Sequence, residues 1–224
     1  MTSAIIVAAG ASRRMGFDKL AAELCGKPVL RWSIEAFDAC DAVDEIIIVA
    51  GDAVREMVQP WIDAKVFRKP VSLCVGGAER HLSVHEGLRK VSVACDIVAV
   101  HDGARPLIAP EQIARCVLKA RELKAVACAR PVTETLKRAD ARGAITESIV
   151  RDGVWVMETP QVFQRALLND AYERVLRDGL KVTDEVSAVQ HLGAEVFVVE
   201  NAALNLKITH PADLILAEKL IKAR

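Results

Sequence analysis

The sequence predicts an α/β fold in which a doubly wound, mostly parallel sheet lies between layers of helices. Short apolar runs alternate along the chain with longer amphipathic stretches, which is the order that βαβ units require. Hydrophobic residues make up 52% of the chain but aromatic residues only 4%, so we expect an aliphatic core of the kind found around buried parallel strands. The 224 residues correspond to about 1.5 average domains. We therefore expect a single domain, 1–224, with an appendage.

The first half of the chain supplies four expected strands. They cover residues 4–8, 45–50, 71–75 and 96–101. Each is a run of Val, Ile, Leu and Ala that ends close to a Gly or an Asp-Gly pair. Helical spacing predicts a helix over 29–39, with Leu30, Ile34 and Phe37 on one face, and another helix after Gly77.

The second half continues the alternation after one interruption. The expected elements are a helix at 110–119, a strand at 125–129, helices at 164–177 and 184–191, a strand at 195–199 and a closing helix from Pro211. Between 131 and 159 the pattern breaks, and alternating apolar residues predict two hairpin-like strands. Asp152-Gly153 is a hairpin signal, so we expect the hairpin to turn at 151–153. We interpret 131–159 as an inserted β-arm.

The overall charge excludes one class of function. Thirty Lys and Arg residues balance thirty Asp and Glu residues, whereas a general nucleic-acid binder is strongly basic. No apolar run approaches the roughly 20 residues that span a bilayer, and no export signal is evident. The six cysteines form no C-x-x-C pair, which favours free thiols in a reducing compartment. We expect a cytoplasmic protein that binds neither nucleic acid nor membrane.

Ligands of open α/β sheets bind outside the carboxyl ends of the strands, so the residues that follow each strand are the candidates. After the first strand, Ala8, Ala9 and Gly10 allow a close backbone approach, while Arg14 and Lys19 add positive charge. The segment matches neither G-x-G-x-x-G nor a Walker P-loop. It predicts a polyphosphate cradle; the alternative is a tight turn with solvated basic residues.

A second candidate segment follows the third strand. Gly76-Gly77 allows backbone contact with a base or sugar, and Ser83 lies within reach as a donor. The alternative is a simple turn before a helix. His81 and His85 have the i, i+4 spacing of metal ligands, but no third ligand is evident, so we do not expect a metal there.

Two further segments complete the candidate site. Asp102 follows the fourth strand, where a carboxylate is a natural Mg²⁺ ligand near phosphates or, alternatively, a turn residue. Arg105 pairs with the substrate or anchors the loop. Lys207 lies in a short strand-like run, where it either completes the phosphate environment or is an edge-strand lysine.

With these segments assembled, the chain resembles the 2-C-methyl-D-erythritol 4-phosphate cytidylyltransferases of the non-mevalonate isoprenoid pathway. The matching stretches cover almost the whole chain in the family's order: 8–10 with 13–15, 76–80 with 83–84, 101–106, 131–132 with 135–138, 159–161, 183–185 and 205–209. The resemblance implies a nucleotide-diphospho-sugar transferase-like fold. It also implies transfer of a cytidylyl group from CTP to methylerythritol phosphate, with Mg²⁺ as cofactor and pyrophosphate as product.

The resemblance further implies roles for individual residues. Arg14 and Lys19 would hold the triphosphate and stabilise the transition state, and Asp102 and Lys207 would serve the metal and the phosphates. The residues around the nucleotide would be Ala8, Ala9, Gly10, Gly77, Arg80, Ser83, Asp102 and Gly103. The residues facing methylerythritol phosphate would be Arg105, Thr135, Thr183, Lys207 and Arg151. Arg151 would reach across from the other subunit, because the family dimerises through an extended arm.

One stretch departs from the family pattern and leaves alternatives open. The family usually has Pro-Lys-Gln where this chain has Asp18-Lys19-Leu20, and 12–19 resembles the molybdenum-cofactor guanylyltransferases instead. Ribitol 5-phosphate cytidylyltransferase is a second alternative, since it shares the fold, the nucleotide and the arm. A nucleotide-binding regulatory module without catalysis is a third. The joint presence of Arg14, Lys19, Asp102 and Lys207 argues against that last alternative.

Overall fold

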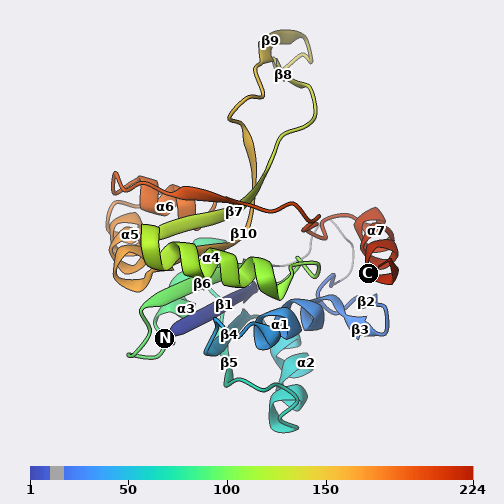
Figure 1. The fold of residues 1–224 in the computed structure, drawn as a ribbon, viewed down its shortest axis with the longest axis vertical. Coiled ribbons are helices and arrows are strands. Elements are labelled where there is room, and N and C mark those ends of the chain that lie inside the picture. The colour runs from blue at the N-terminus through green and yellow to red at the C-terminus, as the bar shows by residue number, and fades with distance from the viewer. Residues whose placement is uncertain (11–17, 224) are drawn as a thin grey trace.

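A single large sheet organises the molecule (Figure 1). The computed structural model describes residues 1–10 and 18–223. Within them the sheet has seven strands in the order β11 (Phe197–Glu200), β7 (Ala125–Pro131), β10 (Trp155–Gln164), β6 (Ile97–Asp102), β1 (Thr2–Ala8), β4 (Glu45–Ala50) and β5 (Val71–Val75). Strand β10 runs antiparallel to β6 and β7, and the other pairings in this sheet are parallel. The predicted doubly wound, mostly parallel sheet is confirmed.

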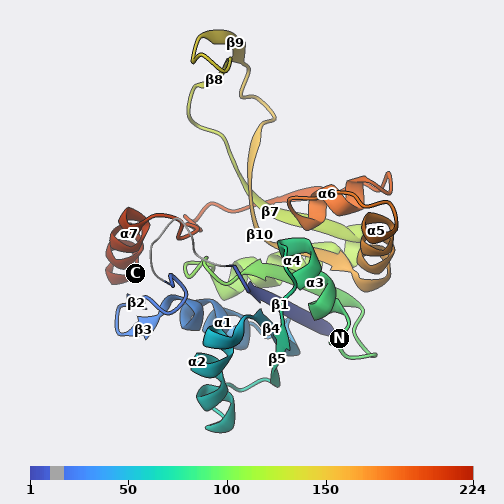
Figure 2. The same ribbon diagram turned by 180° about the vertical axis from the view of Figure 1, so that it is seen from behind.

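Helices cover both faces of this sheet, as Figures 1 and 2 show from opposite sides. One face carries α1 (Val29–Ala39), α2 (Asp52–Asp63), α4 (Pro110–Leu123) and α7 (Pro211–Lys222). The other face carries α3 (Arg80–Leu88), α5 (Arg165–Arg177) and α6 (Glu185–Gln190). Along β1, Ala4 and Ile6 point into the first apolar layer and Ile5 into the second. Because both faces are covered, this period of two explains the near-continuous apolar runs of β1 and β4.

Several elements coincide with their predicted bounds, and two were missed. The helix at 29–39 and the strands at 45–50 and 71–75 have the bounds expected from the sequence. Helix α2 was missed, and Pro60 within it is a residue that ordinarily signals a helix end. A small hairpin of β2 (Glu23–Leu24) and β3 (Lys27–Pro28) was also missed.

The segment that follows the arm differs from the expectation. The arm was expected to extend to 159, but Trp155 already pairs with Pro131, and β10 continues through the sheet to Gln164. Its side chains at Glu158, Thr159 and Gln161 are polar yet buried. The strand therefore lacks the apolar run that identifies the other buried strands in the sequence.

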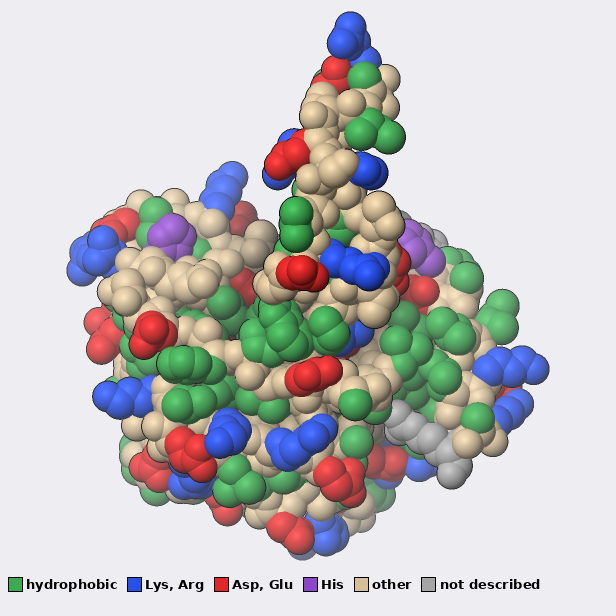
Figure 3. Space-filling model, turned by 45° about the horizontal axis from the view of Figure 1, so that its top comes forward, with side chains coloured by type: hydrophobic (Ala, Val, Ile, Leu, Met, Phe, Trp, Pro, Cys, Tyr) green, Lys and Arg blue, Asp and Glu red, His purple; other side chains and the backbone are tan. Residues whose placement is uncertain are grey.

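The arm stands clear of the sheet in both ribbon views and in the space-filling view (Figures 1–3). Its tip is a hairpin of β8 (Leu136–Ala139) and β9 (Ile145–Ile149), paired Leu136 with Ile149. The predicted turn position was wrong: the hairpin turns between Asp140 and Ala144, whose backbone groups hydrogen-bond to each other. The turn at 151–153 instead leads from β9 to β10. No residue from 132 to 154 is buried.

Six free cysteines occur among the described residues, five of them buried. None of the helices in the described ranges is both long and apolar enough to cross a lipid bilayer.

Candidate functional site

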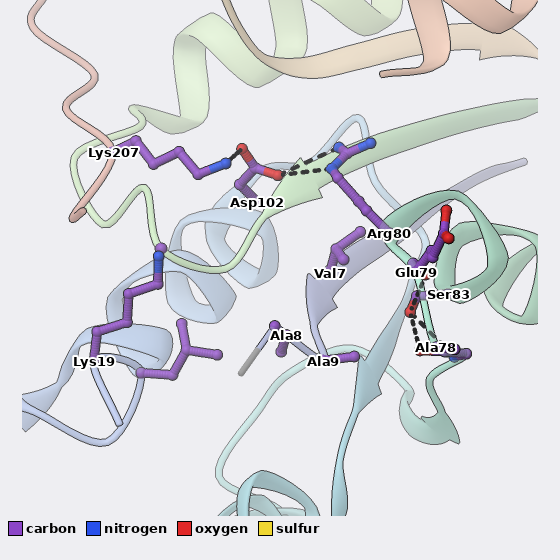
Figure 4. A pocket seen from close by; sticks show the side chains of 14 residues that line it. Val7, Ala8, Ala9, Lys19, Ala78, Glu79, Arg80, Ser83, Asp102 and Lys207 are labelled. Carbon is purple, nitrogen blue, oxygen red and sulfur yellow. Dashed lines mark hydrogen bonds and ion pairs between the residues drawn. The ribbon is translucent and has the colours of Figure 1, made fainter. Parts of the chain in front are cut away.

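A cavity of about 240 Å³ opens at the carboxyl ends of β1, β5 and β6 (Figure 4). It is lined by Val7, Ala8, Ala9, Gly10, Lys19, Leu20, Gly77, Ala78, Glu79, Arg80, Ser83, Asp102, Ala104 and Lys207. Strands β1 and β6 are neighbours, and the chain continues from β1 to β4 toward one edge of the sheet and from β6 to β7 toward the other edge. Such a switch point is where open α/β sheets bind ligands.

Asp102 is the central carboxylate of the cavity. Its Oδ2 accepts from Lys207 Nζ at 2.8 Å and lies 3.5 Å from Arg105 Nε, while Oδ1 lies 3.3 Å from Arg80 Nη2. Burial opposes ionisation of Asp102, but Arg80 and Lys207 outweigh burial and hold the pKa of the carboxyl well below its usual range. The site therefore holds a fixed negative charge within a ring of cations.

Arg80 reaches Asp102 from the first turn of α3 and is held from behind by a second carboxylate. Its Nη1 and Nη2 donate to Glu185 at 2.6 and 3.0 Å. Burial disfavours the guanidinium charge, yet Glu185 and Asp102 raise the pKa of Arg80 above its ordinary value. Arg80 is thus permanently charged and bridges two acidic residues.

The two lysines lie on the side of the cavity opposite Ser83 (Figure 4). Lys19 Nζ donates to the Ile208 carbonyl at 2.9 Å, so Lys19 borders the segment 205–209, and Lys207 belongs to it. This segment is irregular, so the strand-like run expected there is wrong. Instead, the Ile208 amide donates to the Ala104 carbonyl and the Asn205 side chain donates to the Thr159 carbonyl. These bonds orient Lys207 toward Asp102 without a strand.

A glycine allows two loops to meet on the Ser83 side. A Cβ at Gly76 would lie 2.4 Å from the Ala9 Cβ and 3.0 Å from Ser83 Oγ, so any larger residue would separate the loops. Ser83 Oγ accepts from the Gly77 amide at 3.1 Å, which fixes the shape of the loop. This end of the cavity therefore presents closely spaced backbone to a flat group.

Comparison with known proteins decides the family. The family model described as IspD, 2-C-methyl-D-erythritol 4-phosphate cytidylyltransferase, matches residues 2–223. The chain belongs to this cytidylyltransferase family. The alternatives of a ribitol 5-phosphate cytidylyltransferase and of a molybdenum-cofactor guanylyltransferase are not favoured.

Relatives in this family align with nearly all of the chain. A 2-C-methyl-D-erythritol 4-phosphate cytidylyltransferase of Caldanaerobacter subterraneus is 40% identical over 98% of both chains. A chloroplastic one of Oryza sativa is 34% identical over 99% of this chain and 75% of the relative. Among solved structures, 4-diphosphocytidyl-2C-methyl-D-erythritol synthase of Anaerococcus prevotii has a TM-score of 0.88, with 28% identity over 99% of this chain and 98% of the other.

The cavity of this cytidylyltransferase family member brings together most of the residues expected to bind the nucleotide. Among the residues predicted from the sequence, those lining the cavity are Ala8, Ala9, Gly10, Lys19, Gly77, Arg80, Ser83, Asp102 and Lys207. Gly103 is not a lining residue; its amide donates to the Val7 carbonyl at 3.0 Å and ties β6 to β1. Arg14 lies outside the described residues.

The residues expected to face the acceptor are dispersed. Arg105 anchors the loop, since it donates to the Asn205 carbonyl at 2.7 Å and to the Met157 carbonyl at 3.4 Å. Thr135 and Arg151 are exposed on the arm, and Thr183 is exposed before α6. Within the described ranges, none of these four residues lines the cavity.

Sequence reasoning missed the role of Glu185. It was noted only as part of the family's 183–185 stretch, although it is fully buried and paired with Arg80. The two residues are 105 positions apart, so no local pattern could have linked them.

A single carboxylate, that of Asp102, fits a magnesium ion that is bound mainly by phosphates. No group of three or more His, Cys, Asp or Glu side chains able to hold a metal occurs in the part of the chain that the structure describes. Mg²⁺ commonly takes one or two carboxylates and completes its shell with water and substrate phosphates. Asp102, ionised and at the cavity wall, is a suitable single carboxylate.

Proposed function

We propose that the chain transfers a cytidylyl group from CTP to 2-C-methyl-D-erythritol 4-phosphate, giving 4-diphosphocytidyl-2-C-methyl-D-erythritol and pyrophosphate. The observation that carries this proposal is the row of Lys207, Asp102 and Arg80 across a cavity that Lys19 also lines (Figure 4). Such a row suits an anionic triphosphate because the cations outnumber the carboxylate. Family membership supplies the identity of both substrates.

The cavity has a polarity that suits CTP. The lysines on one side would hold the phosphates, and the closely packed backbone of Gly77 and the Ser83 hydroxyl on the other side would surround the base and ribose. Ala8, Ala9 and Gly10 lie at the end of β1, where small side chains let a phosphate approach the backbone.

The reaction needs charge neutralisation more than acid–base help. The phosphate of the acceptor attacks the α-phosphorus of CTP in line, and pyrophosphate leaves. A phosphate oxygen is already anionic, so no general base is required. Lys19, Lys207 and Arg14 would reduce the repulsion between the two anions and hold them in line. Mg²⁺, held by Asp102 and the phosphates of CTP, would supply additional positive charge.

The acceptor site is proposed to be completed by a second copy of the chain. The arm projects from the sheet, and Arg151 and Thr135 are exposed on it. Ile145 and Val150 on the arm and Phe197 and Val198 on the edge strand β11 are exposed apolar side chains that a homodimer would cover. Arg151 of one subunit would then contact the acceptor phosphate in the cavity of the other. Free thiols throughout fit action in the reducing cytoplasm.

The test is a substrate panel read by pyrophosphate release. CTP and GTP are each offered with methylerythritol phosphate, ribitol phosphate and molybdopterin. We expect release only with CTP and methylerythritol phosphate. Preference for ribitol phosphate, or for GTP with molybdopterin, would assign a different nucleotidyltransferase, and CTP binding without release from any acceptor would indicate a regulatory module.

A substitution at Lys19 tests the site itself. Lys19→Ala should lower kcat by a factor of several hundred, because losing one preorganised cation at the transferring phosphorus costs about 3–4 kcal/mol. The control is Lys119→Ala on α4, where the lysine pairs with the exposed Glu122. Near wild-type turnover in Lys19→Ala would contradict the assignment.

A further inference from the structure

Glu185 is a buried acidic residue that the reaction does not use directly. It is the first residue of α6, has no exposed surface and is not among the residues that line the cavity. An ionised side chain in such a place is costly unless its oxygens are fully paired.

The carboxylate of Glu185 is fully paired. Oε1 accepts from Arg80 Nη1 at 2.6 Å and from the Tyr172 hydroxyl at 2.9 Å, and Oε2 accepts from Arg80 Nη2 at 3.0 Å. These contacts to Arg80 are shorter than the 3.3 and 3.4 Å contacts that Arg80 makes with Oδ1 of Asp102. Glu185 is therefore the firmer of the two anchors of the guanidinium.

The position of Glu185 is itself fixed by the sheet. Gln161 of β10 accepts from the backbone amides of Glu185 and Val186, both at 3.1 Å. The same side chain donates to Asp184, which caps α6 by accepting from the Ser187 amide. A continuous set of hydrogen bonds thus connects strand β10 to Arg80.

We propose that Glu185 is a positioning residue that holds the Arg80 guanidinium against Asp102 and at the wall of the nucleotide cavity. This inference rests on the proposed function, because it assigns Arg80 to the binding of CTP. A guanidinium with a carboxylate on each of two edges has its plane fixed, whereas one with a single carboxylate can rotate about it. Glu185 thus orients the cation of Arg80, which contacts the nucleotide, while Glu185 itself does not.

Loss of this anchor would also change the surroundings of Asp102. Arg80 already contacts Asp102 at 3.3 Å, and without Glu185 its guanidinium would pair with Asp102 alone, beside Lys207 and Arg105. Asp102 would then be less available to a metal bound with the triphosphate. The effect should therefore appear in CTP binding rather than in binding of the acceptor.

The experiment is a double-mutant cycle with Glu185→Gln, Arg80→Met and the double variant of the full-length chain. CTP affinity is measured by calorimetry in the presence of magnesium, and KM for each substrate is measured separately. Glu185→Gln should weaken CTP binding roughly tenfold to a hundredfold, as expected for hydrogen bonds to a charged group, and leave KM for the acceptor within about twofold. The double variant should bind CTP no more weakly than Arg80→Met.

The matched control is Glu45→Gln. Glu45 also accepts side-chain and backbone hydrogen bonds, from Ser3 and Ser92, but at the opposite end of the strands. It should leave CTP affinity unchanged, so a loss caused only by weakened packing is recognised. Where Glu185→Gln alone does not fold, the double variant has no unpaired buried guanidinium and still provides the comparison with Arg80→Met.

Two results would overturn the inference. One is a folded Glu185→Gln variant with wild-type CTP affinity, and the other is a double variant whose loss of affinity is the product of the two single losses. A wild-type chain that releases no pyrophosphate from CTP would instead refute the proposed function. The two failures are thus distinguishable.

Discussion

At the scale of single residues, a buried histidine joins the loops that hold the site. A carbonyl oxygen can only accept, so His101 Nε2, which lies 3.3 Å from the Arg105 carbonyl, carries the ring proton and donates to it. Nδ1 of the neutral ring therefore accepts from Thr159 Oγ1 at 2.9 Å, and Thr159 Oγ1 in turn accepts from the Asp102 amide at 3.1 Å. One neutral imidazole therefore connects β10 to both ends of the 102–105 turn. Burial lowers the pKa of His101 to about 3, which keeps it neutral.

This shift predicts a pH-dependent stability. The unfolded chain binds a proton at His101 below about 6.5, while the folded chain does not until about 3. The contribution of the neutral ring is therefore complete above 6.5 and is lost as the pH falls toward 3, at up to about 1.4 kcal/mol per pH unit. Urea unfolding of the wild type and of His101→Asn should show the wild type losing its advantage between pH 6 and pH 4. Parallel stability curves would contradict the buried neutral state.

Residues of this kind mark the limit of what the sequence could predict. Lys19, Asp102 and Lys207 were expected at the site because they follow apolar strands or interrupt apolar runs. Glu185 and Thr159 were not assigned roles there, because their partners lie 105 and 57 positions away. Buried polar contacts between distant segments leave no periodic trace.

At the scale of elements, predictability followed the hydrophobic pattern. Strands β4 and β5 and helix α1 match their expected bounds because each has a clear apolar face or run. Strand β10 was not predicted because its buried face carries polar residues that support the cavity. The arm hairpin was predicted at the wrong position because Asp152-Gly153 is a stronger turn signal than 140–144. Local turn chemistry could not say which strands would pair.

The arm allows a test at this scale. Replacing 136–149 with a short Asn-Gly turn should leave the sheet folded, because no residue from 132 to 154 is buried. The shortened chain should be monomeric in sedimentation equilibrium, keep a wild-type far-ultraviolet dichroism per residue outside the arm, and bind CTP with unchanged affinity. Aggregation of the shortened chain, or a persistent dimer, would contradict a role of the arm in dimerisation alone.

At the scale of the whole molecule, the proposed dimer makes each cavity depend on two chains. A cavity would take Lys19, Asp102 and Lys207 from one subunit and Arg151 from the arm of the other. The formally neutral chain would in this way collect cations from two copies at one place.

Subunit complementation tests this arrangement. Lys19→Ala and Arg151→Ala should each be inactive alone, but a mixture that exchanges subunits should recover about a quarter of wild-type activity, because half of the dimers are mixed and each has one intact cavity. In a mixture of Lys19→Ala with Lys207→Ala, both lysines act in their own subunit. Every cavity therefore lacks one of the two lysines, in mixed dimers as well. The mixture should stay inactive and serve as the control.

The arm leaves the sheet after β7 and returns as β10, and these two strands are hydrogen-bonded neighbours with Pro131 opposite Trp155. Its two ends are therefore held together by the sheet, whatever lies between them. In evolution such an excursion can lengthen or shorten by pairs of residues without disturbing the core, since each doubling of a flexible loop costs only about 0.6 kcal/mol. The surface of the proposed dimer can thus diverge while the cavity stays unchanged.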